Sequence, residues 1–311
     1  MKYSEFRGVR IPQFTLGTVQ LGMDYGLGEF TAKPSEDYAF EILDCAARHG
    51  VSMLDTANNY GTSETVIGRW LRSRGDTADM QVVTKIGPLD HSSSAALRED
   101  ILRQTRASME NLGVSQLDVL MIHSFEDYDR DKETCREVFR EMREMGWYRL
   151  SAISAYSRHD YRVLAESGFD AVQIPLNVFD WSQIENGGIS AMADAGMLIF
   201  VRSVFLQGLV FMKPEELDPR MDFCAPYLKR YLALCREFGV SPAALAVSFA
   251  LSVPGVRSVV LGVQRVEQLE SNCELMEQLI SLSPAQMDSL HAAFRGIDPR
   301  VVNPGCWFNH T

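Results

Sequence analysis

The chain has 311 residues, of which 46% are hydrophobic and 23% are charged, a composition typical of a globular protein with a large core. Its formal net charge of −11 argues against a general nucleic-acid binder and against a protein that coats anionic membranes. We therefore expect no nucleic-acid partner and no membrane partner, although a local basic pocket for one phosphate is compatible with this charge.

Targeting and redox signals are weak. The N-terminus lacks the apolar segment of a signal peptide, and no apolar run approaches the roughly 20 residues of a membrane-spanning helix. The six cysteines form no C-x-x-C pair, which predicts buried free thiols in a reducing compartment. We therefore expect a cytoplasmic protein, and nothing in the sequence defines its oligomeric state.

Short apolar runs alternate with amphipathic segments. The runs are apolar at nearly every position, as in parallel strands that are buried on both faces. Eight such runs are found, at 14–17, 51–54, 81–85, 118–122, 150–154, 171–174, 197–201 and 258–261. Helical stripes follow the 3.6-residue period at 39–47, 138–145, 266–280 and 287–294. Eight strands alternating with helices predict one closed (β/α)8 TIM barrel that spans residues 1–311 as a single domain.

A doubly wound parallel sheet is the alternative fold for such a pattern. Its dinucleotide-binding form carries G-x-G-x-x-G directly after a strand, and the sequence has no such motif. Two segments lack a clear period. Residues 205–226 contain three prolines and predict a long loop after the seventh strand, and residues 295–311 predict a C-terminal tail near the barrel mouth.

Four polar residues fall at or just past the ends of neighbouring predicted strands. Asp55 and Tyr60 follow the second strand, Lys85 ends the third, and His123 ends the fourth. In a barrel these strand ends meet over one mouth, so we expect the four side chains to converge. Each residue alone has an ordinary structural role open to it, such as a turn, a cap or packing. It is their joint placement that favours a catalytic site.

The four groups suit proton transfer to a carbonyl oxygen. A free tyrosine titrates near pH ~10, and a neighbouring lysine ammonium lowers that pKa because it stabilises the phenolate. An aspartate keeps the lysine charged, and a histidine can hydrogen-bond the substrate oxygen. Together they predict a general acid, Tyr60, that acts while another group attacks the carbon.

Other chemistries lack their motifs. The histidines form neither H-x-H nor H-E-x-x-H, so we predict no metal centre, and no G-x-S-x-G nucleophile motif occurs. A hydrolase with two carboxylates is not excluded by spacing, but no second acid follows the strands beside Asp55.

With these residues in place, the chain resembles the aldo-keto reductase superfamily over nearly its whole length. The resemblance rests on LGTVQLG at 16–22, LDTANNYG at 54–61, TK at 84–85 and LDVLMIH at 117–123. It implies a catalytic tetrad of Asp55, Tyr60, Lys85 and His123, and a nicotinamide cofactor.

The resemblance extends to the cofactor segments, which are VQIPLN at 172–177, RSVFLQGL at 202–209 and GVQRVEQLESN at 262–272. The cofactor residues that it implies are Gly17, Thr18, Asp55, Ser154, Gln173, Arg202, Ser203, Leu206, Gly208, Gly262, Gln264, Arg265, Gln268 and Asn272. Two positions depart from the family pattern. Ala155 stands where an asparagine is usual after the fifth strand, and Gln264 or Val263 replaces a serine.

The resemblance favours NADP(H), with NAD(H) as the alternative. Arg265 is placed to neutralise a 2′-phosphate, although it is equally compatible with a solvated arginine at a helix start. The predicted substrate is a small carbonyl compound or a sugar. Candidate substrate residues are Tyr25, Phe125, Trp181 and Trp307, each equally compatible with ordinary packing.

Two functions from different classes follow from this sequence. The first is an NADP(H)-dependent oxidoreductase that interconverts an aldehyde or ketone with an alcohol. The alternative is a nicotinamide-binding regulatory or interaction protein with little or no turnover, as some members of the superfamily are. The complete tetrad favours the enzyme.

Overall fold

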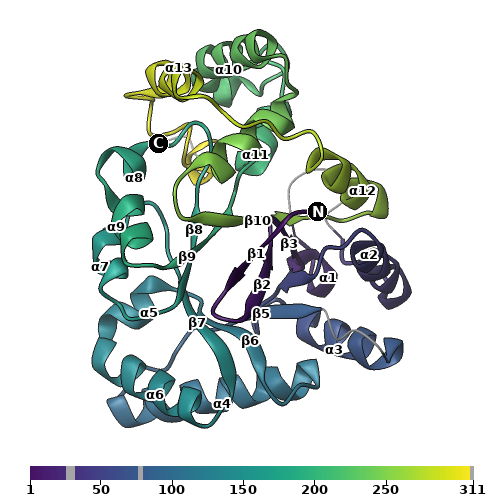
Figure 1. Ribbon diagram of the computed structural model, residues 1–311, viewed down its shortest axis with the longest axis vertical. Helices are drawn as coiled ribbons and strands as arrows, with labels where there is room; N and C mark the ends of the chain where they lie inside the picture. The colour runs from purple at the N-terminus through teal and green to yellow at the C-terminus, as the bar shows by residue number, and fades with distance from the viewer. Residues whose placement is uncertain (26–31, 76–79, 309–311) are drawn as a thin grey trace.

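The computed structural model describes residues 1–25, 32–75 and 80–308, and its centre is a closed barrel of eight parallel strands (Figure 1). In ring order the strands are β10 (Val256–Gly262), β3 (Phe14–Gly17), β4 (Met53–Asp55), β5 (Gln81–Ile86), β6 (Leu117–Ile122), β7 (Tyr148–Ser154), β8 (Ala171–Pro175) and β9 (Leu198–Arg202). The predicted (β/α)8 barrel is therefore confirmed. All eight predicted strands are present, with ends that differ by one or two residues.

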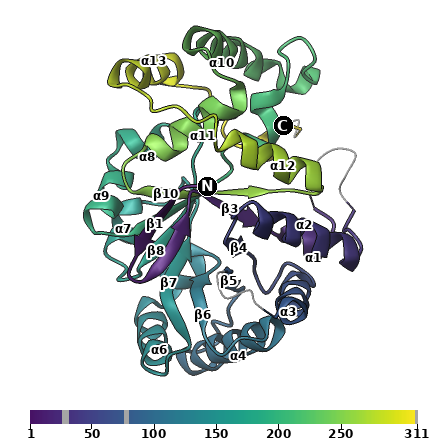
Figure 2. The ribbon, with the colours of Figure 1, turned by 45° about the vertical axis from the view of Figure 1, so that its right-hand side comes forward.

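Helices surround the barrel. They are α1 (Val19–Gly22), α2 (Glu36–Arg48), α3 (Ser63–Arg74), α4 (Ser94–Leu112), α5 (Phe125–Arg130), α6 (Lys132–Glu144), α7 (Tyr161–Ala165), α8 (Ser182–Glu185), α9 (Gly188–Asp194), α10 (Ala225–Phe238), α11 (Pro242–Ser252), α12 (Val266–Leu275) and α13 (Pro284–Phe294). Several of them, such as α4, α6 and α11, pack an apolar face on the strands, whereas α10 and α13 pack on each other. The predicted stripe at 266–280 is too long, since α12 ends at Leu275. α10 and α13 lie side by side in both views (Figure 1, Figure 2).

An antiparallel hairpin, which the sequence patterns did not reveal, precedes the barrel. It consists of β1 (Tyr3–Phe6) and β2 (Val9–Pro12), joined by Arg7 and Gly8, both with positive φ. Val9 and Ile11 are fully buried in the same apolar cluster as the inward-facing residues of the barrel. Figure 1 shows the hairpin across the centre of the ring of strands, so it closes the N-terminal end of the barrel.

Inside the barrel, side chains alternate between inward and outward positions. The inward cluster is apolar: Met53, Val83, Val119, Met121, Leu150, Ala152, Ala171, Leu198 and Phe200. Two residues further along each strand, the inward positions reach the carboxyl end and form a layer that we call the top layer. Its members are Gly17, Asp55, Lys85, His123, Ser154, Gln173, Arg202 and Gly262. All eight are residues that the sequence assigned to the site.

The segment after β9 is more regular than the predicted loop 205–226. It contains two 3-10 helices, η1 (Leu206–Phe211) and η2 (Pro219–Cys224), and α10 begins at Ala225. The backbone has positive φ at Ser203, Leu206, Gln207 and Gly208. The C-terminal tail contains a short 3-10 helix, η3 (Pro304–Cys306), and it contacts this segment where Arg220 lies over the ring of Phe308 at 4.7 Å.

All six cysteines are free, as predicted, and five of them are buried. In the part of the chain that the structure describes, no single helix is both long enough and apolar enough to cross a membrane. One pair of consecutive segments, 219–238 and 242–252, reaches that length and apolarity only together, and it bends by 87°.

Candidate active site

The four predicted catalytic residues meet at the carboxyl end of the barrel. Asp55 is the last residue of β4, Lys85 lies near the end of β5, and His123 directly follows β6. Tyr60 comes from the loop between β4 and α3, whose backbone is held to the next strand by the Asn58 N–H to Lys85 carbonyl hydrogen bond of 2.9 Å. Parallel strands bring these residues together because their carboxyl ends share one edge.

A buried ion pair forms the base of the site. Lys85 Nζ donates to Asp55 Oδ2 at 2.7 Å and to the Thr56 carbonyl at 2.8 Å, and Lys85 is fully buried. Burial disfavours the charge of Lys85, but the charge and hydrogen bond of Asp55, together with Tyr60, outweigh it and raise the pKa of the lysine. Gln173 Nε2 donates to Asp55 Oδ1 at 2.8 Å, so both carboxylate oxygens are engaged. Lys85 is therefore a fixed, charged ammonium.

Tyr60 lies against this ammonium. Lys85 Nζ is 5.0 Å from the centre of the Tyr60 ring, and His123 packs edge to face on the same ring at 5.6 Å. Burial raises the pKa of Tyr60 above 10, while Lys85 lowers it by a smaller amount. The expected lysine effect is present, but burial exceeds it. The phenol is therefore protonated at neutral pH.

His123 is held neutral. Burial, followed by the charges of Lys85 and Arg202, lowers the pKa of its imidazole to about 3. Its Nδ1 is buried and has no hydrogen-bond partner among the described residues. A neutral imidazole next to a protonated phenol can donate a hydrogen bond to an oxygen without repelling the lysine.

Two glycines let the Tyr60 loop pack closely on α1, a feature that the sequence reasoning did not identify. A Cβ at Gly22 would lie 1.8 Å from the Tyr60 carbonyl oxygen, and a Cβ at Gly61 would lie 2.3 Å from the Gly22 carbonyl oxygen. The hydroxyl of Thr18 donates to the Asp55 carbonyl at 2.9 Å and pairs with that of Ser63. Thr18, predicted to bind cofactor, is fully buried and holds β4 and α3 in place.

A cleft of about 920 Å³ opens beside the top layer, between the segments that follow β3, β9 and β10. Five of the predicted cofactor residues line it: Gly262, Gln264, Arg265, Gln268 and Asn272. Residues that sequence reasoning did not assign also line it, namely Gln20, Phe205, Gln207, Phe211, Glu267 and Ser271. The α12 helix begins in this cleft with Arg265 as its N-cap residue.

The other predicted cofactor residues lie elsewhere. Gly17, Ser154, Gln173 and Arg202 belong to the top layer, with Gln173 committed to Asp55. Ser203, Leu206 and Gly208 shape the turn after β9 through their positive φ angles, and the Leu206 side chain is buried. Gly17 lies beside Gly262, and a Cβ at Gly17 would make an ordinary van der Waals contact with Gly262 Cα at 3.4 Å.

Only one of the four predicted substrate residues lines the cleft. Tyr25 does so, and it is 52% exposed. Phe125 packs on His159 at 4.7 Å, and Trp181 is buried between Phe249 and His291 at 5.0 and 4.9 Å. The Trp307 indole is buried and donates to the Arg300 and Val301 carbonyls. Phe125, Trp181 and Trp307 therefore all have packing contacts, and their assignment to the substrate stays a prediction.

An eight-stranded barrel with a buried acid–lysine pair, a phenol and a cleft at the carboxyl ends of its strands has the architecture of a barrel enzyme. The chain belongs to the aldo/keto reductase family, whose model matches residues 13–294, and it is therefore classed as an oxidoreductase.

Relatives agree with this assignment. The chain is 27% identical over 305 residues to a D-threo-aldose 1-dehydrogenase from Pseudomonas sp, covering 86% of this chain and 90% of the relative. It is 24% identical over 288 residues to a protein named "Probable voltage-gated potassium channel subunit beta" from Arabidopsis thaliana, covering 81% and 86%. The holo form of an aldo-keto reductase from Bacillus halodurans shares the fold, with a TM-score of 0.75 at 20% identity over 97% of this chain and all of that one.

Proposed function

We propose that the chain is an NADP(H)-dependent oxidoreductase that reduces an aldehyde or ketone to an alcohol, or catalyses the reverse reaction. The observation that carries this proposal is the buried Asp55–Lys85 ion pair beside the protonated phenol of Tyr60. A phenol next to a fixed ammonium is a general acid whose conjugate base is stabilised where it forms. Its substrate is a small carbonyl compound or a sugar.

The chain's own residues fit a dinucleotide. The cleft of about 920 Å³ has polar side chains at the start of α12, where backbone N–H groups favour a phosphate. We propose that Gln264, Gln268 and Asn272 hold the adenosine end and that Arg265 favours a 2′-phosphate, and thus NADP(H) over NAD(H). When bound, a nicotinamide cofactor supplies a hydride to the carbonyl carbon, or accepts one in the reverse direction.

Proton transfer is the task of the tetrad. In the reducing direction, Tyr60 Oη gives its proton to the carbonyl oxygen, and the phenolate that remains is stabilised by the ammonium of Lys85. Asp55 keeps that ammonium charged and fixed, and neutral His123 donates a hydrogen bond to the same oxygen. In the oxidising direction, the phenolate takes the proton from the alcohol. The six free thiols suit a reducing compartment, which supports a cytoplasmic enzyme.

The test is the loss of NADPH absorbance with a panel of small aldehydes. We expect Tyr60→Phe to lower turnover by roughly 10²–10⁴-fold, because only the transferable proton is removed. The Kd for NADPH should be nearly unchanged. Tyr3→Phe is the matched control, since it removes a phenol that donates to the Gly50 carbonyl at the other end of the barrel. Wild-type turnover in Tyr60→Phe would refute the assignment.

The relatives named as potassium channel subunits favour one alternative, a nicotinamide-binding interaction protein. The same experiment separates the two functions. Tight NADPH binding without turnover of any carbonyl in the panel supports the interaction protein, whereas turnover that depends on Tyr60 supports the enzyme.

A further inference from the structure

Arg202 contributes a second cation to the top layer. It is the last residue of β9, and the inward positions of that strand are Leu198, Phe200 and, by the same alternation, Arg202. Its charge lies close enough to lower the pKa of both Tyr60 and His123. Arg202 is half-buried and is not among the residues that line the large cleft.

The guanidinium of Arg202 is weakly satisfied. Its one hydrogen bond within the described residues is a long one of 3.3 Å, from Nη2 to the Ala155 carbonyl, and its Cζ lies 4.5 Å from the centre of the Tyr156 ring. No carboxylate of the described residues forms an ion pair with it, whereas Lys85 has Asp55. Because a half-buried cation is costly without a counter-ion, the arrangement calls for an anion from outside the chain.

We propose that Arg202 binds a carboxylate carried by the substrate, so that the enzyme acts on anionic carbonyl compounds. This inference rests on the proposed function. The planar guanidinium forms two parallel hydrogen bonds with a carboxylate, which fixes the orientation of the molecule as well as its affinity.

The test compares succinate semialdehyde with its primary amide, a neutral analogue of the same length. We expect the wild type to prefer the carboxylate, and Arg202→Gln to lower kcat/KM for it by at least about tenfold, mainly through KM. The amide should lose a smaller factor in kcat/KM than the carboxylate does, and Arg202→Lys should restore part of the loss for the carboxylate. Arg158→Gln is the matched control, since Arg158 lies on the same Tyr156 ring at 4.6 Å but is paired with Glu126.

The outcomes separate this inference from the proposed function. Equal losses for both substrates, or weaker NADPH binding in Arg202→Gln, overturn it while leaving the reductase in place. Binding of 4-hydroxybutyrate, measured by calorimetry with and without NADPH, tests the carboxylate site without turnover. Binding that Arg202→Gln abolishes supports the site, and no binding overturns it. If the enzyme prefers a phosphorylated aldehyde to the carboxylate substrate, Arg202 binds phosphate, and the carboxylate assignment is overturned.

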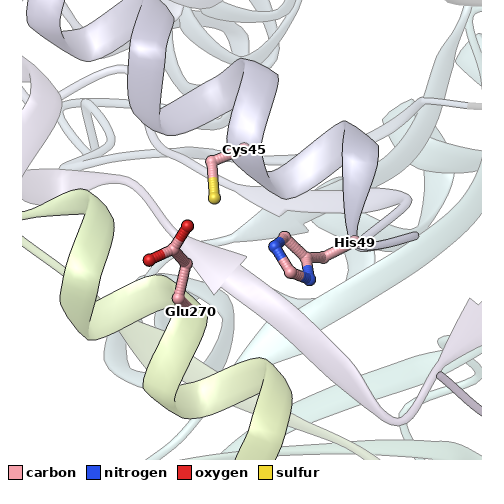
Figure 3. Close-up of side chains that lie close together, drawn as sticks. All are labelled: Cys45, His49 and Glu270. Carbon is pink, nitrogen blue, oxygen red and sulfur yellow. The ribbon is translucent and has the colours of Figure 1, made fainter.

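A different part of the molecule carries a second, independent inference. Cys45 lies on α2, His49 is the C-cap residue of the same helix four positions later, and Glu270 faces them from α12 (Figure 3). One potential ligand atom from each lies within 4.8 Å of the others. Among the described residues, none of the three side chains forms a hydrogen bond or an ion pair. Three groups that can bind a metal therefore lie close together, and Cys273 is near enough to interact electrostatically with Cys45 and Glu270.

We infer that these three residues bind a zinc ion that bridges α2 and α12. Thiolate, imidazole and carboxylate are the ligands that Zn²⁺ takes in proteins, and a fourth position is left for water or for Cys273, one turn along α12 from Glu270. The opposite face of α12 carries Gln268 and Asn272 into the cleft. A metal that ties α12 to α2 therefore stabilises the helix on which the proposed cofactor site depends.

Calorimetry with Zn²⁺ in competition with a chelator tests the site, with Co²⁺ as a spectroscopic probe. We expect one ion per chain, a thiolate-to-cobalt charge-transfer band, and loss of both in Cys45→Ser. His49→Gln and Glu270→Gln alter exposed side chains and should weaken binding by at least about tenfold without unfolding the protein. Cys306→Ser, at a partly exposed cysteine in the tail, is the control. Absence of saturable binding, or a site removed by the control substitution, overturns the inference.

Discussion

The two ends of the barrel are built from the same strands but differ in what fills them. At the N-terminal end, the hairpin places Val9 and Ile11 against inward-facing apolar residues, and this region is a packed apolar core. At the C-terminal end, the next inward positions are Asp55, Lys85, Gln173 and Arg202, and a cleft opens beside them. One further step along each strand changes the interior from a packed core to a charged site.

This difference shows where the fold tolerates unfavourable burial. A buried ammonium costs free energy unless it is paired, and Lys85 is paired. The apolar end has no such requirement, since hydrophobic burial alone stabilises it. We therefore expect substitutions at the two ends to separate stability from activity.

The largest expected effect is at the charged end. Lys85→Met leaves the carboxylate of Asp55 buried without its cation, which we expect to lower the free energy of unfolding by about 3–5 kcal/mol and to abolish turnover. Denaturant unfolding measures the first effect, and NADPH oxidation measures the second.

The double variant Asp55→Asn/Lys85→Met is the control for this prediction. It removes both charges, so most of the lost stability should return while turnover stays absent. If the double variant is no more stable than the single one, the ion pair is not the origin of the loss.

A smaller effect is expected at the apolar end. Ile11→Ala removes a fully buried side chain beneath the barrel and should lower the free energy of unfolding by about 2–4 kcal/mol. The kcat of the folded variant should match that of the wild type, since the top layer is untouched. Glu5→Ala, at an exposed position of the same hairpin, should change stability by less than about 0.5 kcal/mol. A large loss of kcat in Ile11→Ala would show that the two ends are not independent.

Sequence patterns predicted the barrel and the tetrad because both follow from local signals. Buried parallel strands are apolar throughout, and the polar residues that interrupt them, such as Asp55 and Lys85, stand out. The sequence patterns did not predict the N-terminal hairpin, because its two strands have only four residues each and the Arg7–Gly8 turn is their only local signal. The alternation of apolar and polar residues on both sides of Gly8 is the signal that would have predicted the hairpin.

Other features depend on contacts that no local pattern encodes. The net direction of the Tyr60 pKa shift follows from the balance of burial against Lys85, and burial depends on the whole fold. Trp181 follows a strand, as a substrate residue would, yet Phe249 and His291 from distant helices cover it. The spacing of Leu198, Phe200 and Arg202 is visible in the sequence. Only the structure shows that this face of the strand points into the barrel.

The last prediction concerns His123 and the pH, and at neutral pH it involves no loss of stability. Its pKa is about 3 in the folded protein, mainly through burial, and near 6.5 when unfolded. Between these values the unfolded chain binds a proton that the folded chain does not. The contribution of His123 to stability therefore falls as the pH drops through 6.5, by up to about 1.4 kcal/mol per pH unit. Denaturant unfolding from pH 8 to pH 4, compared between the wild type and His123→Gln, measures it.

The other titrating groups contribute equally to the wild type and to His123→Gln. The difference between the two slopes of unfolding free energy against pH therefore reports His123 alone. We expect His123→Gln to lose stability less steeply below pH 6.5, and kcat/KM of the wild type to show no inflection from an imidazole between pH 5 and 8. Identical slopes would mean that His123 is solvated in the folded protein. The charged end would then be open to water at this side chain. Burial of the catalytic groups would no longer distinguish it as a site that is charged and yet shielded from solvent.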